Sequence, residues 1–240
     1  SRGLGDVYKR QSSELMSNTS TNGKGLFLGN ISGVPPTEIV IIGSDKIAEA
    51  AALTATRLGA SVKVFSNSIF KLNKIQKLIG NPIYSSTIQK KQLLKALMRC
   101  DVAIGTITNS TSSDSVISED MVLKMKKGAI IIDVSIDTGG TFQTSELTSH
   151  DKSTFVKHDV IHYCVPNIPS RYSRTSSLCL SNVITPYLVK SVKFGSFENF
   201  IRNNNSFKKG VYLYNGLSTK MVLSQILDIK YNDINNILWN

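Results

Sequence analysis

The fold is decided by residues 38–65, which read EIVIIGSDKIAEAAALTATRLGASVKVF. The short β-branched run Glu38–Ile42 is typical of a buried parallel strand. An alanine-rich helix is expected over Ile47–Leu58, with Gly59 as its C-terminal stop. A second strand is expected over Ser61–Phe65. A strand, a glycine turn, a helix and a further strand in this order predict a βαβ unit with a right-handed crossover.

The same alternation continues downstream of this unit. Short apolar runs recur between segments whose apolar residues follow the helical period. The expected helices are Ile69–Leu78, Gln89–Met98 and Glu119–Met125, and the expected strands are Ile83–Ser85, Asp101–Gly105 and Ala129–Asp133. This pattern predicts an α/β protein with a Rossmann-like, doubly wound parallel sheet.

The rhythm changes after Gly140. One or two strands are expected within Phe155–Cys164, and a long helix is expected over Ser173–Val192, with a kink at Pro186. The remaining expected elements are helices at Phe197–Ile201 and Ser218–Leu227 and an extended piece at Gly210–Gly216. This tail is not another βαβ unit, so it is interpreted as a helical segment of a second domain.

Composition excludes several classes of protein. The 240 residues are 41% hydrophobic and 19% charged, which fits a folded chain rather than a disordered one. The three cysteines lack CxxC spacing, so neither a disulfide framework nor a zinc site is expected; Cys164 and Cys179 are interpreted as small buried apolar residues. No stretch reaches the ~18 apolar residues of a membrane span, and the start does not read as a signal peptide. A cytoplasmic protein without membrane contact is expected.

The net charge of +11 raises the question of a nucleic-acid partner. The densest lysine clusters, Lys71–Lys77, Lys90–Lys95 and Lys124–Lys127, are mixed with apolar residues as on helix surfaces. No basic stripe is interleaved with aromatic residues. We therefore expect no nucleic-acid partner.

The turn after the first strand is the expected ligand site. Ligands of open parallel sheets bind beyond the carboxyl ends of the strands, and a helix N-terminus holds phosphate well. The turn reads GSDKIA from Gly43, so it keeps the first glycine of the GxGxxG fingerprint and has Ala48 as the third. Asp45 replaces the second glycine and adds a negative charge where a pyrophosphate would approach. Ser44 and Ile47 are the other candidate cofactor contacts of this turn.

A second departure lies at the end of the second strand. An Asp or Glu that holds the ribose 2′-hydroxyl is expected there, but the sequence has Phe65, Ser66 and Asn67. Ser66 could still form a hydrogen bond, and a 2′-phosphate would be less repelled, although no arginine is near in the sequence. From the two turns alone, dinucleotide binding and a Rossmann-like domain without a ligand are both open.

Several uncommon motifs, in the same order, resemble those of the alanine dehydrogenases and the related transhydrogenase and saccharopine-type domains. The resemblance runs from about Gly23 to the end. It leans toward alanine dehydrogenase, because that family's IDQGG survives here as IDTGG. The motifs are GKGLFLGNISGVPP at Gly23–Pro36, DVSIDTGG at Asp133–Gly140, TSHD at Thr148–Asp151, HYCVPNIP at His162–Pro169, RTS at Arg174–Ser176 and GVYLYNG at Gly210–Gly216.

The resemblance implies an NAD-dependent oxidoreductase that converts L-alanine, water and NAD to pyruvate, ammonia and NADH. Asp137 matches the family's catalytic aspartate, whose carboxylate can assist proton transfer. Asn167 matches an asparagine near the substrate. The other matching positions are Lys71 near the adenine ribose, Ser86, Ile104 and Gly105 around the adenosine and pyrophosphate, and Val134, Val165 and Ile168 at the nicotinamide.

Structural roles are alternatives for these residues. Asp137 could be a turn former before two glycines, and Asn167 could form an Asx-turn between prolines. Asp133 is expected to be structural. Surface or structural roles are expected for the three histidines, and a salt bridge at a helix start is expected for Arg171 and Arg174.

The resemblance also implies the domain organisation. Residues 1–22 are expected to be a disordered or artefactual tail, residues 23–168 the NAD-binding domain, and residues 169–240 a return into a substrate domain that is mostly absent. The family's substrate arginine, substrate lysine and catalytic histidine lie in an N-terminal domain, and this chain is expected to begin after it. A homohexamer is implied. The alternatives are a catalytically decayed scaffold and a transhydrogenase- or saccharopine-type relative.

Overall fold

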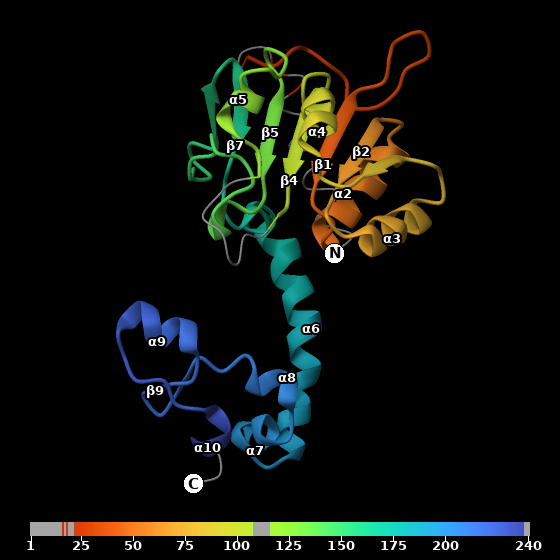
Figure 1. Ribbon diagram of the computed structural model, residues 1–240. Coiled ribbons are helices and arrows are strands. Elements are labelled where there is room, and N and C mark those ends of the chain that lie inside the picture. The colour runs from red at the N-terminus through yellow and green to blue at the C-terminus, as the bar shows by residue number, and fades with distance from the viewer. Residues whose placement is uncertain (1–15, 17, 19–21, 108–115, 238–240) are drawn as a thin grey trace. The chain divides into compact units, whose positions relative to one another are not determined.

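The computed structural model describes residues 16, 18, 22–107 and 116–237. The chain forms two compact units, residues 1–171 and 172–240, and each is described by itself (Figure 1). The predicted tail over residues 1–22 lies almost entirely outside the described residues. Within it, Met16 is buried in the core of the first unit, and its carbonyl accepts a hydrogen bond from the Leu26 N–H at 3.2 Å.

The first unit is built on a seven-stranded sheet of order β3-β2-β1-β4-β5-β7-β6. All neighbouring strands pair parallel except β6, which is antiparallel to β7. The predicted Rossmann-like parallel sheet is confirmed. The strands are β1 (Glu38–Ile42), β2 (Ser61–Phe65), β3 (Tyr84–Ser86), β4 (Val102–Gly105), β5 (Ile130–Asp133), β6 (Thr154–Lys157) and β7 (Val160–Tyr163).

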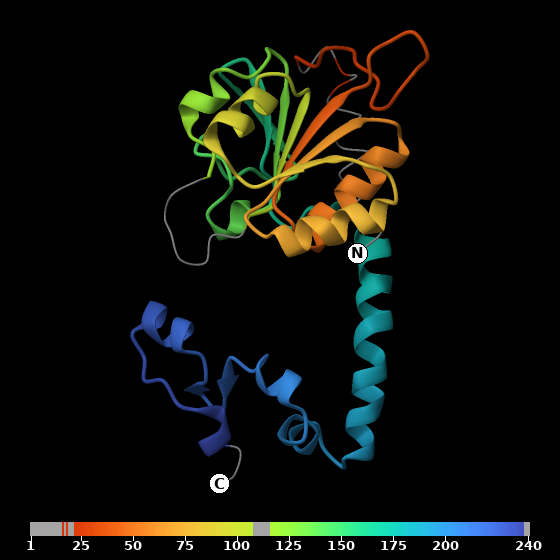
Figure 2. The same cartoon turned by 45° about the vertical axis from the view of Figure 1, so that its right-hand side comes forward.

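Helices cover both faces of this sheet (Figure 2). Alternate residues of β1 point to opposite faces, so Ile39 and Ile41 pack with α2 and α3, whereas Val40 and Ile42 pack with α4 and α5. Two separate cores result, one on each face. The helices are α2 (Lys46–Arg57), α3 (Ile69–Ile79), α4 (Lys90–Leu97) and α5 (Glu119–Val122), and the 3-10 turns are η2 (Ile136–Thr138) and η3 (Ile168–Tyr172).

Helix α5 is shorter than the sequence predicts. Its periodic residues suggest a helix to Met125, but the regular helix ends at Val122. Beyond it the backbone tightens, because the Met125 N–H donates to the Val122 carbonyl three residues back. Met121, Val122 and Met125 are all still buried, which explains why the apolar spacing resembled a longer helix.

The β6–β7 hairpin buries a histidine. His158 and Asp159 form its two-residue turn with φ values of 56° and 58°, as a type I′ turn requires. On the second strand, His162 is fully buried and stacked on Phe155 with ring centroids 4.8 Å apart. Its Nε2 lies 2.8 Å from Thr144 Oγ1 and its Nδ1 lies 3.0 Å from the Val160 carbonyl. The carbonyl can only accept, so Nδ1 carries the proton and Nε2 accepts from the threonine.

We expect His162 to make the first unit less stable in acid. Burial lowers the pKa of His162 below its ordinary 6.5, so the unfolded chain binds the proton more readily. Neutral His162 therefore contributes to the free energy of unfolding above about pH 6.5, and this contribution is lost as the pH falls through the pKa of His162 in the folded state. Melting temperatures between about pH 7.5 and pH 5 should fall less steeply for His162→Gln than for the native chain. The exposed His150→Gln should keep the native slope; an equally steep fall for His162→Gln would contradict the assignment.

The second unit begins with one long helix, α6 (Ser173–Lys193), which continues through Pro186. The predicted helix over Ser218–Leu227 starts only at Met221, because Leu217 and Ser218 pair with the preceding strand in a short hairpin. The other elements of this unit are α7 (Phe197–Arg202), α8 (Asn205–Lys208), β8 (Leu213–Tyr214), β9 (Leu217–Ser218), α9 (Met221–Leu227) and α10 (Ile234–Ile237).

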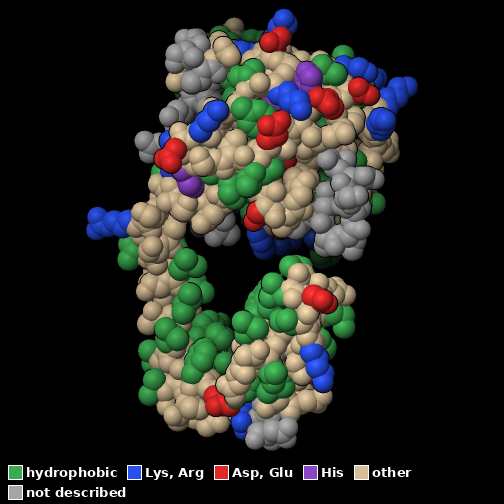
Figure 3. All heavy atoms as spheres, turned by 90° about the vertical axis from the view of Figure 1, so that its left-hand side faces the viewer, with side chains coloured by type: hydrophobic (Ala, Val, Ile, Leu, Met, Phe, Trp, Pro, Cys, Tyr) green, Lys and Arg blue, Asp and Glu red, His purple; other side chains and the backbone are tan. Residues whose placement is uncertain are grey.

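The second unit exposes much apolar surface (Figure 3). Among the described residues of α6, Ser191 alone is buried. The prediction that Cys179 is buried is wrong: it is exposed on α6, because its helix has so little cover. Aromatic rings around the buried Phe200 form the small core of this unit. In the described ranges, no helix combines the length and apolar character needed to cross a membrane.

Candidate functional site

The candidate site lies at the carboxyl edge of the sheet, between β1 and β4. β1 pairs with β2 on one side and with β4 on the other, so the chain leaves the two central strands toward opposite faces. At such a switch point, the loops diverge and leave a crevice in which doubly wound proteins bind ligands. The turns that follow β1, β2 and β5 hold six of the fourteen predicted site residues: Gly43, Ser44, Asp45, Ser66, Val134 and Asp137.

Two glycines bring these turns into close contact. Gly43 has φ +133°, and a Cβ there would lie 2.1 Å from Thr106 Oγ1, in the turn after β4. Its N–H donates to the Phe65 carbonyl at 2.8 Å. A Cβ on Gly105 would lie 2.5 Å from the Thr141 Cβ. Neither position has room for a Cβ, so both need glycine. The turn after β1 therefore packs directly against the turn after β4, and the end of β4 packs against Thr141.

Asp45 has a structural role that the sequence motif did not indicate. It is the N-cap of α2, and its Oδ1 accepts the Ala48 N–H at 2.8 Å. Asp is a preferred N-cap residue, so the position of Asp45 just before an alanine-rich helix is the sequence signal that indicates this role. The N–H groups of Lys46 and Ile47, in the same first turn, have no acceptor within the helix and can serve a ligand.

Serine side chains link the ends of the first strands. Ser44 Oγ and Ser66 Oγ lie 2.6 Å apart and both residues are buried. Ser66 Oγ also accepts the Ser68 N–H at 3.3 Å, and the Ser66 N–H donates to the Ser86 carbonyl at 3.1 Å. The Ser86 hydroxyl donates to Gln92 Oε1 at 2.9 Å. The structure thus brings three predicted cofactor contacts into one row across β1, β2 and β3.

Lys71 lies on the exposed side of the first turn of α3, beyond this row. Its N–H donates to the N-cap hydroxyl of Ser68 at 3.4 Å. The lysine is thus connected through Ser68 to Ser66. Its exposure is compatible with the position near the ribose that the resemblance implies.

Asp137 is exposed on the short helix η2, directly after β5. The turn that carries it is anchored by Asp133, which is fully buried at the end of β5. Asp133 Oδ1 accepts from the N–H and hydroxyl of Ser135, and Oδ2 accepts from the N–H groups of Thr141 and Phe142 and from the Ser145 hydroxyl. The structural role predicted for Asp133 is confirmed, and the carboxylate of Asp137 is left facing outward.

The apolar residues predicted at the nicotinamide end lie at the edge of the core. Ile104, Val165 and Ile168 are buried in the core on the α2 side of the sheet, and Val134 is half-buried against it. Any Rossmann-like core would bury such residues, so their burial does not identify a ligand. Asn167 is exposed with φ 50°, and its carbonyl accepts the N–H and hydroxyl of Ser170. Its backbone therefore forms a turn, while its side chain is accessible.

The salt bridge predicted at the start of the long helix is not found within the part of the chain that the structure describes. Neither Arg171 nor Arg174 forms an ion pair with the described residues, because the first turn of α6 carries no acidic side chain. The exposed histidines have polar partners instead: His158 contacts Glu119 at 2.6 Å and His150 contacts Ser170 at 2.7 Å. These contacts hold surface loops, as expected.

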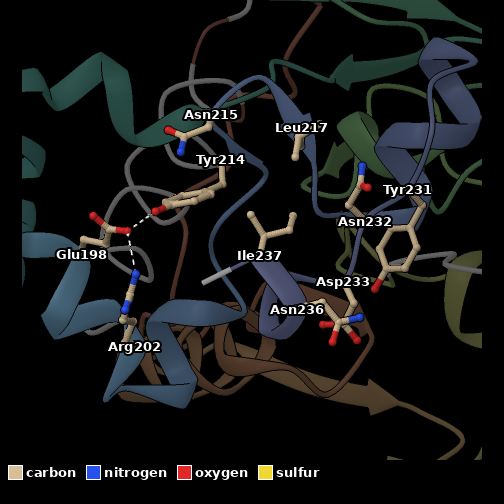
Figure 4. A pocket seen from close by; sticks show the side chains of 10 residues that line it. All are labelled: Glu198, Arg202, Tyr214, Asn215, Leu217, Tyr231, Asn232, Asp233, Asn236 and Ile237. Carbon is tan, nitrogen blue, oxygen red and sulfur yellow. Dashed lines mark hydrogen bonds and ion pairs between the residues drawn. The ribbon is translucent and has the colours of Figure 1, made fainter. Parts of the chain in front are cut away.

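A separate hollow lies in the second unit (Figure 4). It measures about 810 Å³, is wide open, and contains none of the predicted site residues. Glu198 accepts hydrogen bonds from Arg202 and Tyr214 at one side of it. Within the described residues, no group of three or more His, Cys, Asp or Glu side chains could hold a metal ion.

Comparison with known proteins identifies the family. The family model "Alanine dehydrogenase/PNT, C-terminal domain" matches residues 11–221. The chain belongs to this family. The match begins upstream of residue 22, so it includes half of the segment expected to be a tail.

Relatives in this family include alanine dehydrogenase 2 of Staphylococcus aureus strain USA300, which is 31% identical over 218 residues. These residues are 90% of this chain but 58% of that protein. The solved structure of an L-alanine dehydrogenase matches with a TM-score of 0.84 at 26% identity and covers 95% of this chain and 63% of its own. A transhydrogenase from Sinorhizobium meliloti matches with a TM-score of 0.70 at 16% identity, over 92% of this chain and 59% of its own, and supports the fold alone.

Proposed function

We propose that this chain supplies the nucleotide-binding half of an NAD-dependent alanine dehydrogenase. The whole protein would convert L-alanine to pyruvate and ammonia. The observation that carries the proposal is the outward-facing carboxylate of Asp137, held at the end of β5 beside a glycine-lined switch point. Family membership supports the same reading. A cytoplasmic location and a homohexameric assembly belong to the same proposal.

Most of the residues along the crevice suit a dinucleotide, and Asp45 is the exception. The Gly43 turn ends at the N-terminus of α2, where the N–H groups of Lys46 and Ile47 can donate to a pyrophosphate. Val134 offers an apolar contact at the opposite end of the crevice. Asp45 opposes the fit, because its charge lies beside the pyrophosphate position. One of its oxygens also accepts the Ala48 N–H, so this N–H of the first turn is not free to bind the pyrophosphate.

NAD, when bound, accepts a hydride from the substrate Cα, and the protein supplies orientation and proton transfer. In this proposal, Asp137 would accept or hold a proton from the water that adds to the substrate carbon. Its exposure keeps the carboxylate available to substrate rather than to internal donors. The side chain of Asn167, on the turn after β7, is the candidate for orienting the substrate.

The second unit is proposed to complete a substrate domain together with residues that the chain does not include. The exposed apolar residues of α6, among them Leu178, Val183 and Leu188, support this reading. The alternative of a decayed scaffold is favoured by Asp45 and Ser66, which both depart from the dinucleotide pattern. Structural similarity to a transhydrogenase leaves that relative as a further alternative.

Titration of the 240-residue chain with NADH tests the proposal. We expect saturable binding, and we expect Asp45→Asn to tighten it by about fivefold, since like charges a few ångströms apart repel by about 1 kcal/mol. Asn is as good an N-cap as Asp, so this change removes charge while it keeps the cap. Ligand fluorescence and a dialysis assay would both measure the dissociation constant.

Asp151→Asn is the matched control, because it removes the same charge from an exposed loop before β6. It should leave the dissociation constant unchanged. Circular dichroism and melting would establish that each variant is folded. A folded native chain and a folded Asp45→Asn variant that both fail to bind NADH would overturn the proposal in favour of the scaffold.

A further inference from the structure

The adenosine end of the crevice differs from an NAD-selective site in its charge. Dinucleotide folds that select NAD place an Asp or Glu at the end of β2, where it binds the ribose 2′-hydroxyl and repels a 2′-phosphate. Here that place is held by Ser66, the residue after β2. Ser66 is neutral, and its Oγ lies 2.6 Å from Ser44 Oγ.

The Ser44 and Ser66 side chains form an ordered, buried hydrogen-bonded pair at this position. Both residues are at least nine-tenths buried, and Ser66 Oγ also accepts the Ser68 N–H. The pair therefore joins the turn after β1 to the turn before α3 without using a carboxylate. A hydroxyl can donate to or accept from either a ribose hydroxyl or a phosphate oxygen, so it does not discriminate between them.

The surrounding charge is also positive. Between Glu49 and Asp101 the sequence contains nine Lys or Arg residues and no Asp or Glu. This stretch includes β2, α3, β3 and α4, the half of the sheet that would receive the adenosine. Glu49, the acidic residue just before the stretch, is neutralised by Lys46 and Lys74, each 2.8 Å away. Three of the nine cations are ion-paired, Lys63 and Arg99 with Glu38 and Lys74 with Glu49. The other six form no ion pair with the described residues, so this half of the sheet keeps a positive charge that favours an additional phosphate.

Lys71 supplies a cation five residues after Ser66. It lies in the first turn of α3, which contains no acidic residue, although the helix dipole favours an anion at this end. Its ammonium forms no ion pair with the described residues. No arginine fork is present between Ser66 and Lys77, so the site has the charge to tolerate a phosphate but not the bidentate donors that would select for it.

We propose that Ser66 makes the adenosine subsite permissive for a 2′-phosphate, so that this chain accepts NADP(H) as well as NAD(H). The inference rests on the proposed function, because it assigns specificity within the same dinucleotide site. Ser66 is the specificity-determining residue, and Lys71 supports it with its charge.

Parallel titrations with NADH and NADPH test this inference. For the native chain, we expect the two dissociation constants to agree within about threefold. Ser66→Asp restores the repelling carboxylate and should weaken NADPH relative to NADH by at least about tenfold. Ser61→Asp is the matched control: it makes the same change at the opposite end of β2, about 16 Å away, and should leave the ratio unchanged.

Because Ser66 is buried, Lys71→Glu provides a second variant at an exposed position. It should weaken NADPH more than NADH by about fivefold, with an unchanged melting temperature. Native binding of NADH at least tenfold tighter than NADPH would overturn the inference while leaving the proposed function intact. Failure of the folded chain to bind either nucleotide would overturn both.

Discussion

Asp133→Ala should lower the free energy of unfolding by about 3–5 kcal/mol, because it leaves a set of buried donors without an acceptor. Asp133 is fully buried and accepts five hydrogen bonds, from Ser135, Thr141, Phe142 and Ser145. Three of the five donors are backbone N–H groups, which cannot turn to other partners without moving the loop. Urea unfolding followed by circular dichroism would measure the loss.

Two variants separate this effect from a general loss of negative charge. Asp133→Asn keeps the shape but offers one acceptor oxygen, so we expect about half of the loss. Asp137→Ala removes an exposed carboxylate four residues away and should change stability by no more than about 0.5 kcal/mol. A loss of less than about 1 kcal/mol for Asp133→Ala would show that the loop is held by other contacts.

The two aspartates of this loop have different roles. Asp133 holds the turn, and Asp137 is exposed on it. Thr141 extends the anchor, because its Oγ1 lies 2.8 Å from Ser135 Oγ and accepts the Ile107 N–H at 3.2 Å. The turns after β4 and β5 are thereby joined. In the proposed function, loosening Asp133 would displace Asp137, whereas changing Asp137 would leave the turn in place.

The regular part of the fold could be predicted because each element carries its own local signal. β1 and β2 have the predicted bounds, since a β-branched run between a turn and a glycine has few other structures available. α2 begins at Lys46, one residue before its predicted start, because the Asp45 cap fixes that end. Short elements carry too few residues for such a signal. The two-residue strands of the β8–β9 hairpin were therefore not predicted as strands.

The site could be predicted only in part, because its chemistry depends on contacts between distant residues. The Ser44–Ser66 hydrogen bond spans 22 positions and follows from the parallel pairing of β1 with β2. The glycine motif predicts only that Asp45 repels a pyrophosphate. The structure shows in addition that Asp45 caps helix α2. The exposure of Cys179 could not be predicted from its sequence neighbours, because burial on α6 depends on how much of this helix is covered.

Gly43→Ala should lower the free energy of unfolding by about 2–4 kcal/mol and, in the proposed function, abolish NADH binding. The new Cβ would lie 2.1 Å from Thr106 Oγ1 and 3.3 Å from the Thr106 backbone carbon. Threonine has a stiff χ1 torsion, so its hydroxyl cannot swing away freely. The backbone at φ +133° is also unfavourable for any residue with a Cβ. Relief must come from movement of the turns after β1 and β4.

A second substitution separates the clash from the backbone strain. Thr106→Gly removes the hydroxyl that the new Cβ meets, so Gly43→Ala should cost about 1–2 kcal/mol less in that background than in the native chain. Gly80→Ala measures the strain alone, because Gly80 has φ +76° and a Cβ added there would meet no atom within 4 Å. It should cost about 1 kcal/mol. If Gly43→Ala costs no more than Gly80→Ala, the two turns are not in close contact, and the glycine at the crevice is required only for its backbone conformation.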